Sequence, residues 1–267
     1  KPIGNGPYRI KGAGLSAGAT GITLEKNPDY AGTPGHVDRI QVKTYQDEGI
    51  AYRDVQAGTL AVTLVSGSNL TQAAKQDRDR LVEVPFPAVV YLGFPLWDRR
   101  FADQRVREAF SLAIDREALV KSLLGGFGQP ARGLAGKNLP GGGAEDCNAC
   151  TFDPERARRL LDEAGGWKGK LTLWTPQDPT NAAVVEGVAN QLRKNLGIKE
   201  VGTKTRPADQ LYPNLSARKV SDPTLLYLAA GYPHLYALVD AMFSPGSGTN
   251  TTGYESKEFT TALGKAA

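Results

Sequence analysis

The sequence predicts an α/β fold, and two patterns carry that prediction. After Trp97, stretches with the apolar spacing of helices alternate with short apolar runs typical of buried strands. Before Trp97, short alternating strands are separated by turns rich in Gly and Pro. The composition agrees: 40% hydrophobic and 22% charged residues in 267 are ordinary for a globular chain of one large or two average domains.

The first part of the chain is predicted to be rich in strands. Alternating polar and apolar residues over 38–45 predict a half-buried strand, and a helix before Gly58 has a glycine where helices commonly end. We expect a hairpin from residues 8–10 and 22–25, strands over 60–65, 81–86 and 89–94, and short helices over 48–57 and near Asn69.

The second part is predicted to alternate helices and strands. Asp115 and Asp153 stand where helix N-caps are expected, and Pro154 suits the first helical position. We expect helices over 103–114, 115–124, 154–164, 180–196, 208–217, 235–243 and 255–265, and strands over 171–174, 201–205 and 225–230. A long loop over 125–150 interrupts this alternation.

Charge and hydropathy argue against a nucleic-acid partner and against a transmembrane segment. The 32 basic and 28 acidic residues leave a net charge of only +4, and the basic residues are spread among acidic ones. A nucleic-acid binder concentrates them on one face, so no nucleic acid is expected. No apolar run approaches the about 20 residues that span a bilayer, so no transmembrane segment is expected. No secretory leader opens the chain, and we expect it to be absent or already removed.

The two cysteines, Cys147 and Cys150, lie in the long loop. Zinc needs four ligands, and His36 and His234 are far apart in sequence, so no metal is expected. A redox dithiol normally opens a helix, which this pair does not. The pattern favours a local disulfide in an oxidising compartment, contributing about 2 kcal/mol. A zinc site and a redox pair are the alternatives.

One motif resembles a catalytic site. Residues 14–18 match G-x-S-x-G around Ser16, but a strand pattern follows where a nucleophile elbow requires a helix. The glycine motifs for phosphate and dinucleotide binding are incomplete. We therefore expect no catalytic residue and no cofactor, with a hydrolase using Ser16 or a redox enzyme using the cysteines as the alternative.

Aromatic residues gather near the ends of predicted strands. Tyr91, Phe94 and Trp97 mark the change of pattern, Trp174 ends a strand, and Tyr232 and Tyr236 follow one. In open α/β sheets, ligands bind beyond the carboxyl ends of strands. As a group these residues predict a ligand cleft, although each alone is compatible with core packing.

Several segments follow the order of motifs in one protein family. They are Gly4-Asn-Gly-Pro-Tyr-Arg-Ile10, Asn27-Pro-Asp-Tyr30, Val37-Asp-Arg-Ile40, Tyr91-Leu-Gly-Phe94, residues 101–116, residues 152–165 and Asn250-Thr-Thr-Gly-Tyr254. Together they resemble the dipeptide-, oligopeptide- and nickel-binding proteins of ABC importers, which are extracellular solute-binding proteins of family 5, cluster C.

The resemblance implies a two-lobe, periplasmic-binding-protein-like fold of type II, incomplete at both ends of this chain. Residues 1–92 would belong to the first lobe and residues 93–267 to the second. The implied function is a non-catalytic receptor that binds a small solute, peptide-like or other, and delivers it to an ABC permease. Its implied location is extracytoplasmic, in the periplasm or anchored by a lipid at the cell surface. A binding module for signalling or cell-surface recognition is the alternative.

The resemblance and the aromatic pattern together indicate a set of ligand-binding residues. The set is Tyr91, Phe94, Trp97, Trp174, Gly231, Tyr232, His234, Tyr236 and Asn250. The chain departs from the family at two places: Pro95 replaces an Asn, and Gly231 replaces the Asp that holds the ligand's amino group in peptide binders. We therefore expect ligand selection that does not depend on a free α-amino group, unless another acid such as Asp222 replaces the missing one.

Overall fold

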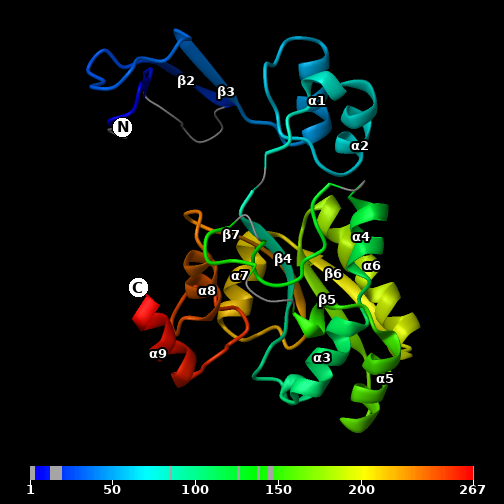
Figure 1. The fold of residues 1–267 in the computed structure, drawn as a ribbon. Helices are drawn as coiled ribbons and strands as arrows, with labels where there is room; N and C mark the ends of the chain where they lie inside the picture. Colours follow the sequence, from blue (N-terminus) through cyan, green and yellow to red (C-terminus); the bar gives the residue numbers. More distant parts are fainter. Residues whose placement is uncertain are drawn as a thin grey trace. The chain divides into compact units, whose positions relative to one another are not determined.

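The computed structural model describes residues 4–12, 20–84, 86–124, 127–136, 139–143 and 147–266 (Figure 1). The chain forms two compact units, Lys1–Val65 and Ser66–Ala267. The first contains a three-stranded sheet and the second a four-stranded sheet. The α/β class predicted from the sequence is therefore confirmed.

The sheet of the first unit is antiparallel and has the order β1-β2-β3. Its strands are β1 (Tyr8–Ile10), β2 (Gly21–Lys26) and β3 (Arg39–Lys43), which confirms the predicted hairpin and third strand. Helix α1 (Glu48–Gln56) follows, and Asp47 caps it by accepting a hydrogen bond from the Ile50 N–H at 2.9 Å. Buried Ala51 and Tyr52 anchor this helix.

The sheet of the second unit has the order β4-β7-β5-β6. Its strands are β4 (Ala88–Gly93), β5 (Leu171–Pro176), β6 (Val201–Arg206) and β7 (Thr224–Ala229). Strands β5, β6 and β7 are parallel, whereas β4 runs antiparallel to β7. The carboxyl ends of the three parallel strands therefore share one edge with the amino end of β4.

The main core lies on one face of this sheet. Helices α3 (Gln104–Leu112), α5 (Pro154–Glu163) and α6 (Pro179–Leu196) cover that face. Strand residues Leu171, Leu173 and Leu225 point into the core, where Phe101 and Phe110 are fully buried. The Phe101 and Phe110 rings meet edge to face, with centroids 6.0 Å apart, a favoured aromatic geometry.

A smaller cluster covers the opposite face. Leu211 and Leu215 of α7 (Ala208–Ser216) pack there with Val220 and with Leu226 of β7. The alternation of side chains along each strand sends neighbours to opposite faces, which is why Leu225 and Leu226 belong to different clusters. Both faces are thus covered by helices.

Two helices start at the predicted capping residues, Asp115 and Asp153, and Asp103 caps a third. Asp103, Asp115 and Asp153 each accept a hydrogen bond from a backbone N–H in the first turn, at 2.8–2.9 Å. Helix α6 ends at Gly197, whose φ of 69° lies in the left-handed region that favours glycine. The remaining helices are α2 (Gly67–Gln76), α4 (Arg116–Leu123), α8 (Leu235–Phe243) and α9 (Lys257–Ala266), with 3-10 turns over Arg78–Arg80, Arg99–Phe101 and Asn148–Cys150.

Two predicted strands are wrong. Residues 60–65 form no strand, and Val62 and Leu64 are 81% and 88% exposed. In the described part of 81–86 there is no strand either, and Val82 and Val84 are largely exposed. Alternation in sequence reports an apolar face, but a strand also needs a neighbour to pair with, and neither segment pairs with one among the described residues.

The boundary between the compact units also differs from the expected change at Tyr91–Trp97. It falls after Val65, and β4 pairs with β7 along its whole length, from Ala88 opposite Ala229 to Gly93 opposite Thr224. Residues 88–92 are therefore part of the second unit's sheet. The assignment of residues 1–92 and 93–267 to two lobes stays a prediction.

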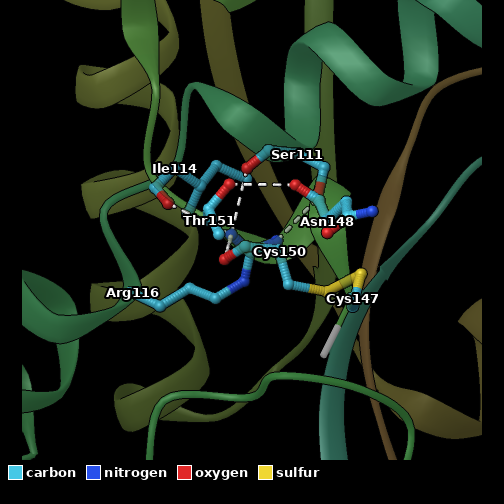
Figure 2. Close-up of a disulfide and its surroundings, with 7 residues drawn as sticks. All are labelled: Ser111, Ile114, Arg116, Cys147, Asn148, Cys150 and Thr151. Carbon is cyan, nitrogen blue, oxygen red and sulfur yellow. Dashed lines mark hydrogen bonds between the residues drawn. A yellow bond between two sulfur atoms is a disulfide. The ribbon is translucent and has the colours of Figure 1, made fainter. Parts of the chain in front are cut away.

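The disulfide prediction is confirmed, because Cys147 and Cys150 are joined, with their Cα atoms 5.1 Å apart (Figure 2). The turn that they close is held by Arg116, whose guanidinium donates to the Cys150 carbonyl oxygen at 3.1 Å. The same guanidinium donates to the Ser111 hydroxyl and to the carbonyl oxygens of Ser111 and Ile114. Burial lowers the pKa of Arg116, and these acceptors compensate for the lost hydration.

A pair of phenylalanine substitutions tests the location of the core. Phe110 is fully buried and Phe152 is 46% exposed. Phe110→Ala is expected to lower the free energy of unfolding by about 3–5 kcal/mol, because it leaves a cavity. Phe152→Ala should change it by at most about 1 kcal/mol. Urea denaturation followed by circular dichroism measures both, and equal losses would contradict the described core.

A second test concerns the disulfide. Replacing both Cys147 and Cys150 by Ala is expected to lower the free energy of unfolding by about 2 kcal/mol, since only a short loop is released. For the unmodified protein, the intact masses measured with and without reductant should differ by two hydrogen atoms. Two free thiols in freshly purified protein from an oxidising compartment would contradict the disulfide.

Candidate functional site

The carboxyl edge of β5, β6 and β7 is the candidate functional site. Pairing continues just beyond the strands, since the Gln177 N–H donates to the Arg206 carbonyl at 2.8 Å and the Ala230 N–H donates to the Pro87 carbonyl at 2.7 Å. These bonds extend the pairing of β5 with β6 and of β7 with β4 beyond the strand ends. In open α/β sheets this is the edge at which ligands bind.

A cavity of about 550 Å³ opens at the ends of β5 and β6. It is lined by Gln177, Asp178, Ala182, Thr205, Pro207 and Ala208. Asp178 caps α6, and its Oδ1 atom accepts a hydrogen bond from the Asn181 N–H at 2.8 Å. The volume is within the range of small-molecule sites, and the lining offers amide, hydroxyl and carboxylate groups for hydrogen bonding.

The segment after β7 presents exposed groups at the same edge. Tyr232 is 53% exposed. His234 caps α8, and its Nδ1 atom accepts a hydrogen bond from the Tyr236 N–H at 3.1 Å, which leaves Nε2 to carry the proton of a neutral ring. A Cβ atom added to Gly231 would meet nothing within 4 Å, so this position has free space and no charged side chain.

Trp174 and Tyr91 lie on the helix α7 face rather than at a strand end. Both pack against the cluster of Leu211, Leu215 and Leu226. Strand β5 continues to Pro176, so the expectation that Trp174 ends a strand is wrong. Desolvation raises the pKa of the Tyr91 hydroxyl, which agrees with a position half inside the core.

Phe94, Trp97 and Asn250 lie at the opposite edge of the sheet. Phe94 belongs to the aromatic core, with its centroid 5.5 Å from that of Phe101. Trp97 is covered by Arg218, whose guanidinium carbon is 5.7 Å from the ring centroid. Asn250 organises a turn by donating to the Tyr254 carbonyl at 2.9 Å and accepting from the Tyr254 N–H at 3.2 Å. All these contacts are with the protein itself, and a role of the three residues in ligand binding stays a prediction.

The structure thus divides the predicted ligand-binding set into three groups. Gly231, Tyr232, His234 and Tyr236 follow β7 at the carboxyl edge, Tyr91 and Trp174 lie on one face, and the other three lie at the far edge. Sequence reasoning missed Gln177, Asp178 and Thr205. They are small polar residues without a motif, and their only signal is their position at or directly after the end of a parallel strand.

The sequence predicted no metal site and no transmembrane segment, and both were sought in the described residues. No group of three or more His, Cys, Asp or Glu side chains that could hold a metal ion occurs among them. Within the same ranges, no helix is both long and apolar enough to cross a bilayer. Ser16 and the rest of its motif lie in residues 13–19, outside the described part of the chain.

Residues 1–250 match the family model of bacterial extracellular solute-binding proteins, family 5. The chain belongs to this family. Its members are extracellular by the family's own description, which agrees with the extracytoplasmic location inferred from the sequence. The resemblance noted in the sequence is therefore confirmed.

Individual relatives carry related names. An ABC transporter peptide-binding protein of Brucella ovis is 32% identical over 170 residues, which are 61% of this chain and 30% of the relative. The dipeptide-binding protein of Escherichia coli is 29% identical over 175 residues, 65% of this chain and 32% of that protein. DppA of Helicobacter pylori, solved in complex with a peptide, superposes with a TM-score of 0.80 at 21% identity, covering 100% of this chain and 52% of that chain.

The superposition confirms the fold class as that of periplasmic binding proteins. It also shows that this chain spans about half the length of the solved relative and that the alignments cover about a third of the curated ones. Only part of a two-lobe arrangement is therefore represented in residues 1–267.

Two substitutions test whether side chains at the carboxyl edge and at the far edge differ in their contribution to stability. Tyr232→Ala should change the free energy of unfolding by less than about 0.5 kcal/mol, because its side chain is exposed. Phe94→Ala should lower it by about 3 kcal/mol, because it leaves a gap between Phe101 and Phe110. Urea titrations give both values, and a large loss for Tyr232→Ala would assign it to packing instead of binding.

Proposed function

We propose that the protein is a non-catalytic solute receptor that binds its ligand between two lobes and delivers it to the permease of an ABC importer. The observation that carries this proposal is the family match over residues 1–250. The carboxyl edge of the second sheet supports it, because it offers a cavity and exposed groups where the fold class holds ligands. We place the receptor in the periplasm or at the cell surface on a lipid anchor.

Ligand capture in such a receptor is a change of population between open and closed forms. The ligand favours closure only to the extent that it binds the closed form more tightly. A hinge between two lobes allows this without chemistry on the ligand. The residues at the carboxyl edge then act by hydrogen bonding and ring stacking: Gln177 and Thr205 at the cavity, and Tyr232 and His234 after β7.

The absence of a carboxylate at Gly231 sets the proposed selectivity. Asp222 does not replace it, because it precedes β7 at the opposite edge and forms an ion pair with Arg100 at 3.1 Å. A buried ammonium group without a paired charge costs several kcal/mol. We therefore propose a ligand that is not held through a free α-amino group, even though relatives are named as peptide-binding proteins.

Native mass spectrometry tests the receptor function. The full-length gene product, isolated under native conditions, is expected to carry a small-molecule adduct that is lost under denaturing conditions. Tyr232→Ala should lower the occupied fraction, and the exposed Phe152→Ala serves as the control. Absence of any bound solute, together with a hydrolytic turnover abolished by Ser16→Ala, would replace the receptor by an enzyme.

Calorimetry with matched tripeptides tests the selectivity. Acetylation of the peptide amino terminus should change the affinity of the unmodified protein by less than about tenfold, or about 1.4 kcal/mol. Gly231→Asp, which fits the free space, should raise the affinity for the free-amine peptide only, and the neutral Gly231→Asn should not. Binding by the unmodified protein that acetylation weakens by about a hundredfold or more would contradict the proposal.

A further inference from the structure

The cations that stack on aromatic rings fall into two kinds. Arg100 lies 5.6 Å from the Trp167 ring centroid and also pairs with Asp98 and Asp222. Arg218 lies 5.7 Å from the Trp97 centroid and also pairs with Glu255 at 3.4 Å. Each of these guanidinium groups therefore has both a ring and a carboxylate as partners.

Lys204 and Arg206 lack the second partner. The Lys204 ammonium is 5.1 Å and the Arg206 guanidinium carbon 5.0 Å from the centroid of the same ring, Trp174. Among the described residues, neither side chain forms an ion pair or a hydrogen bond. Two like charges thus converge on one ring without a carboxylate between them.

The strand register explains how they converge. Trp174 of β5 pairs with Lys204 of β6, and Pro176 pairs with Arg206, so the three side chains project from one face. Arg206 is the last residue of β6 and is followed by Pro207 of the cavity lining. The group therefore begins on the helix α7 face and reaches the carboxyl edge.

The group is open to a ligand. Lys204 is exposed, and Trp174 and Arg206 are half-buried. The electron-rich ring face attracts each cation, but the two cations repel one another, and an anion placed between them would remove that repulsion. Strand β6 is at an edge of the described sheet, where a lysine also discourages pairing with other chains. That role needs one charge and does not account for two on the same tryptophan.

We propose that Trp174, Lys204 and Arg206 form a subsite for a carboxylate or phosphate group attached to a flat apolar group. The guanidinium of Arg206 offers a planar pair of donors to such an anion, and Lys204 supplies a second charge. The Trp174 ring supplies the surface for the apolar part. The inference rests on the proposed receptor function. It means that the ligand would be recognised through an acidic group, whereas the resemblance implies that peptide binders recognise an amino group.

Benzoate and benzamide are the probes, because they share a ring and differ in charge. The full-length gene product is titrated with each at low ionic strength, and Trp174 is followed by intrinsic fluorescence, with Trp174→Phe to identify its signal. Phenyl phosphate extends the comparison to the other anion. Benzoate should bind at least about tenfold more tightly than benzamide, and added salt should reduce the difference.

Matched variants test whether Lys204 and Arg206 cause the preference for benzoate over benzamide. The double variant Lys204→Gln, Arg206→Gln should reduce benzoate affinity to that of benzamide, whereas Lys204→Arg should retain it. Arg218→Gln removes a ring-stacked cation that already has a carboxylate partner and should leave benzoate binding unchanged. Circular dichroism and thermal unfolding establish that each variant is folded.

Three results would overturn the subsite: equal affinity for benzoate and benzamide, no binding of either, or benzoate binding that the double variant retains. If a co-purified solute is present and the double variant keeps it, the subsite fails while the receptor function stands. If benzoate binds through Lys204 and Arg206 but no solute is ever retained, the anion site stands and the receptor function fails.

Discussion

The position of β7 between β4 and β5 is the constraint on which the second unit depends. Its antiparallel pairing with β4 joins segments more than 100 residues apart, and its parallel pairing with β5 adds the rest of the sheet. This pairing sets which side chains face the main core and which face α7. It also places the ends of β5, β6 and β7 at one edge, where the cavity and the exposed Tyr232 lie.

Several charged groups of this unit have fixed partners within the described part of the chain. Aspartates cap α3, α4, α5 and α6, and Arg116 donates to four acceptors around the disulfide turn. Arg100 joins two aspartates at the far edge. Among the cations stacked on rings in the described part of the chain, Lys204 and Arg206 differ from Arg100 and Arg218 because they share one ring and have no acidic partner.

The family match accounts for the architecture, and two local features bear on the proposed ligand. They are the glycine at position 231, which carries no charge, and the two cations beside Trp174, which reach the carboxyl edge of the sheet. Cations without an acidic partner favour acidic ligands over cationic ones. Selectivity in such a receptor is a difference between the affinities for two ligands. The uncharged Gly231 and the two cations both favour an acidic ligand over a cationic one.

Local signals in the sequence determined the helices of the second unit, their caps and the disulfide, because capping and apolar periodicity act within a few residues. The segments at 60–65 and 81–86 were mispredicted, since alternation does not reveal whether a partner strand exists. Tertiary structure alone decided that Phe94 packs in the core while Tyr232 is exposed. It alone brought Trp174, Lys204 and Arg206 together, because that meeting depends on the register of β5 against β6, which pairing between distant segments sets.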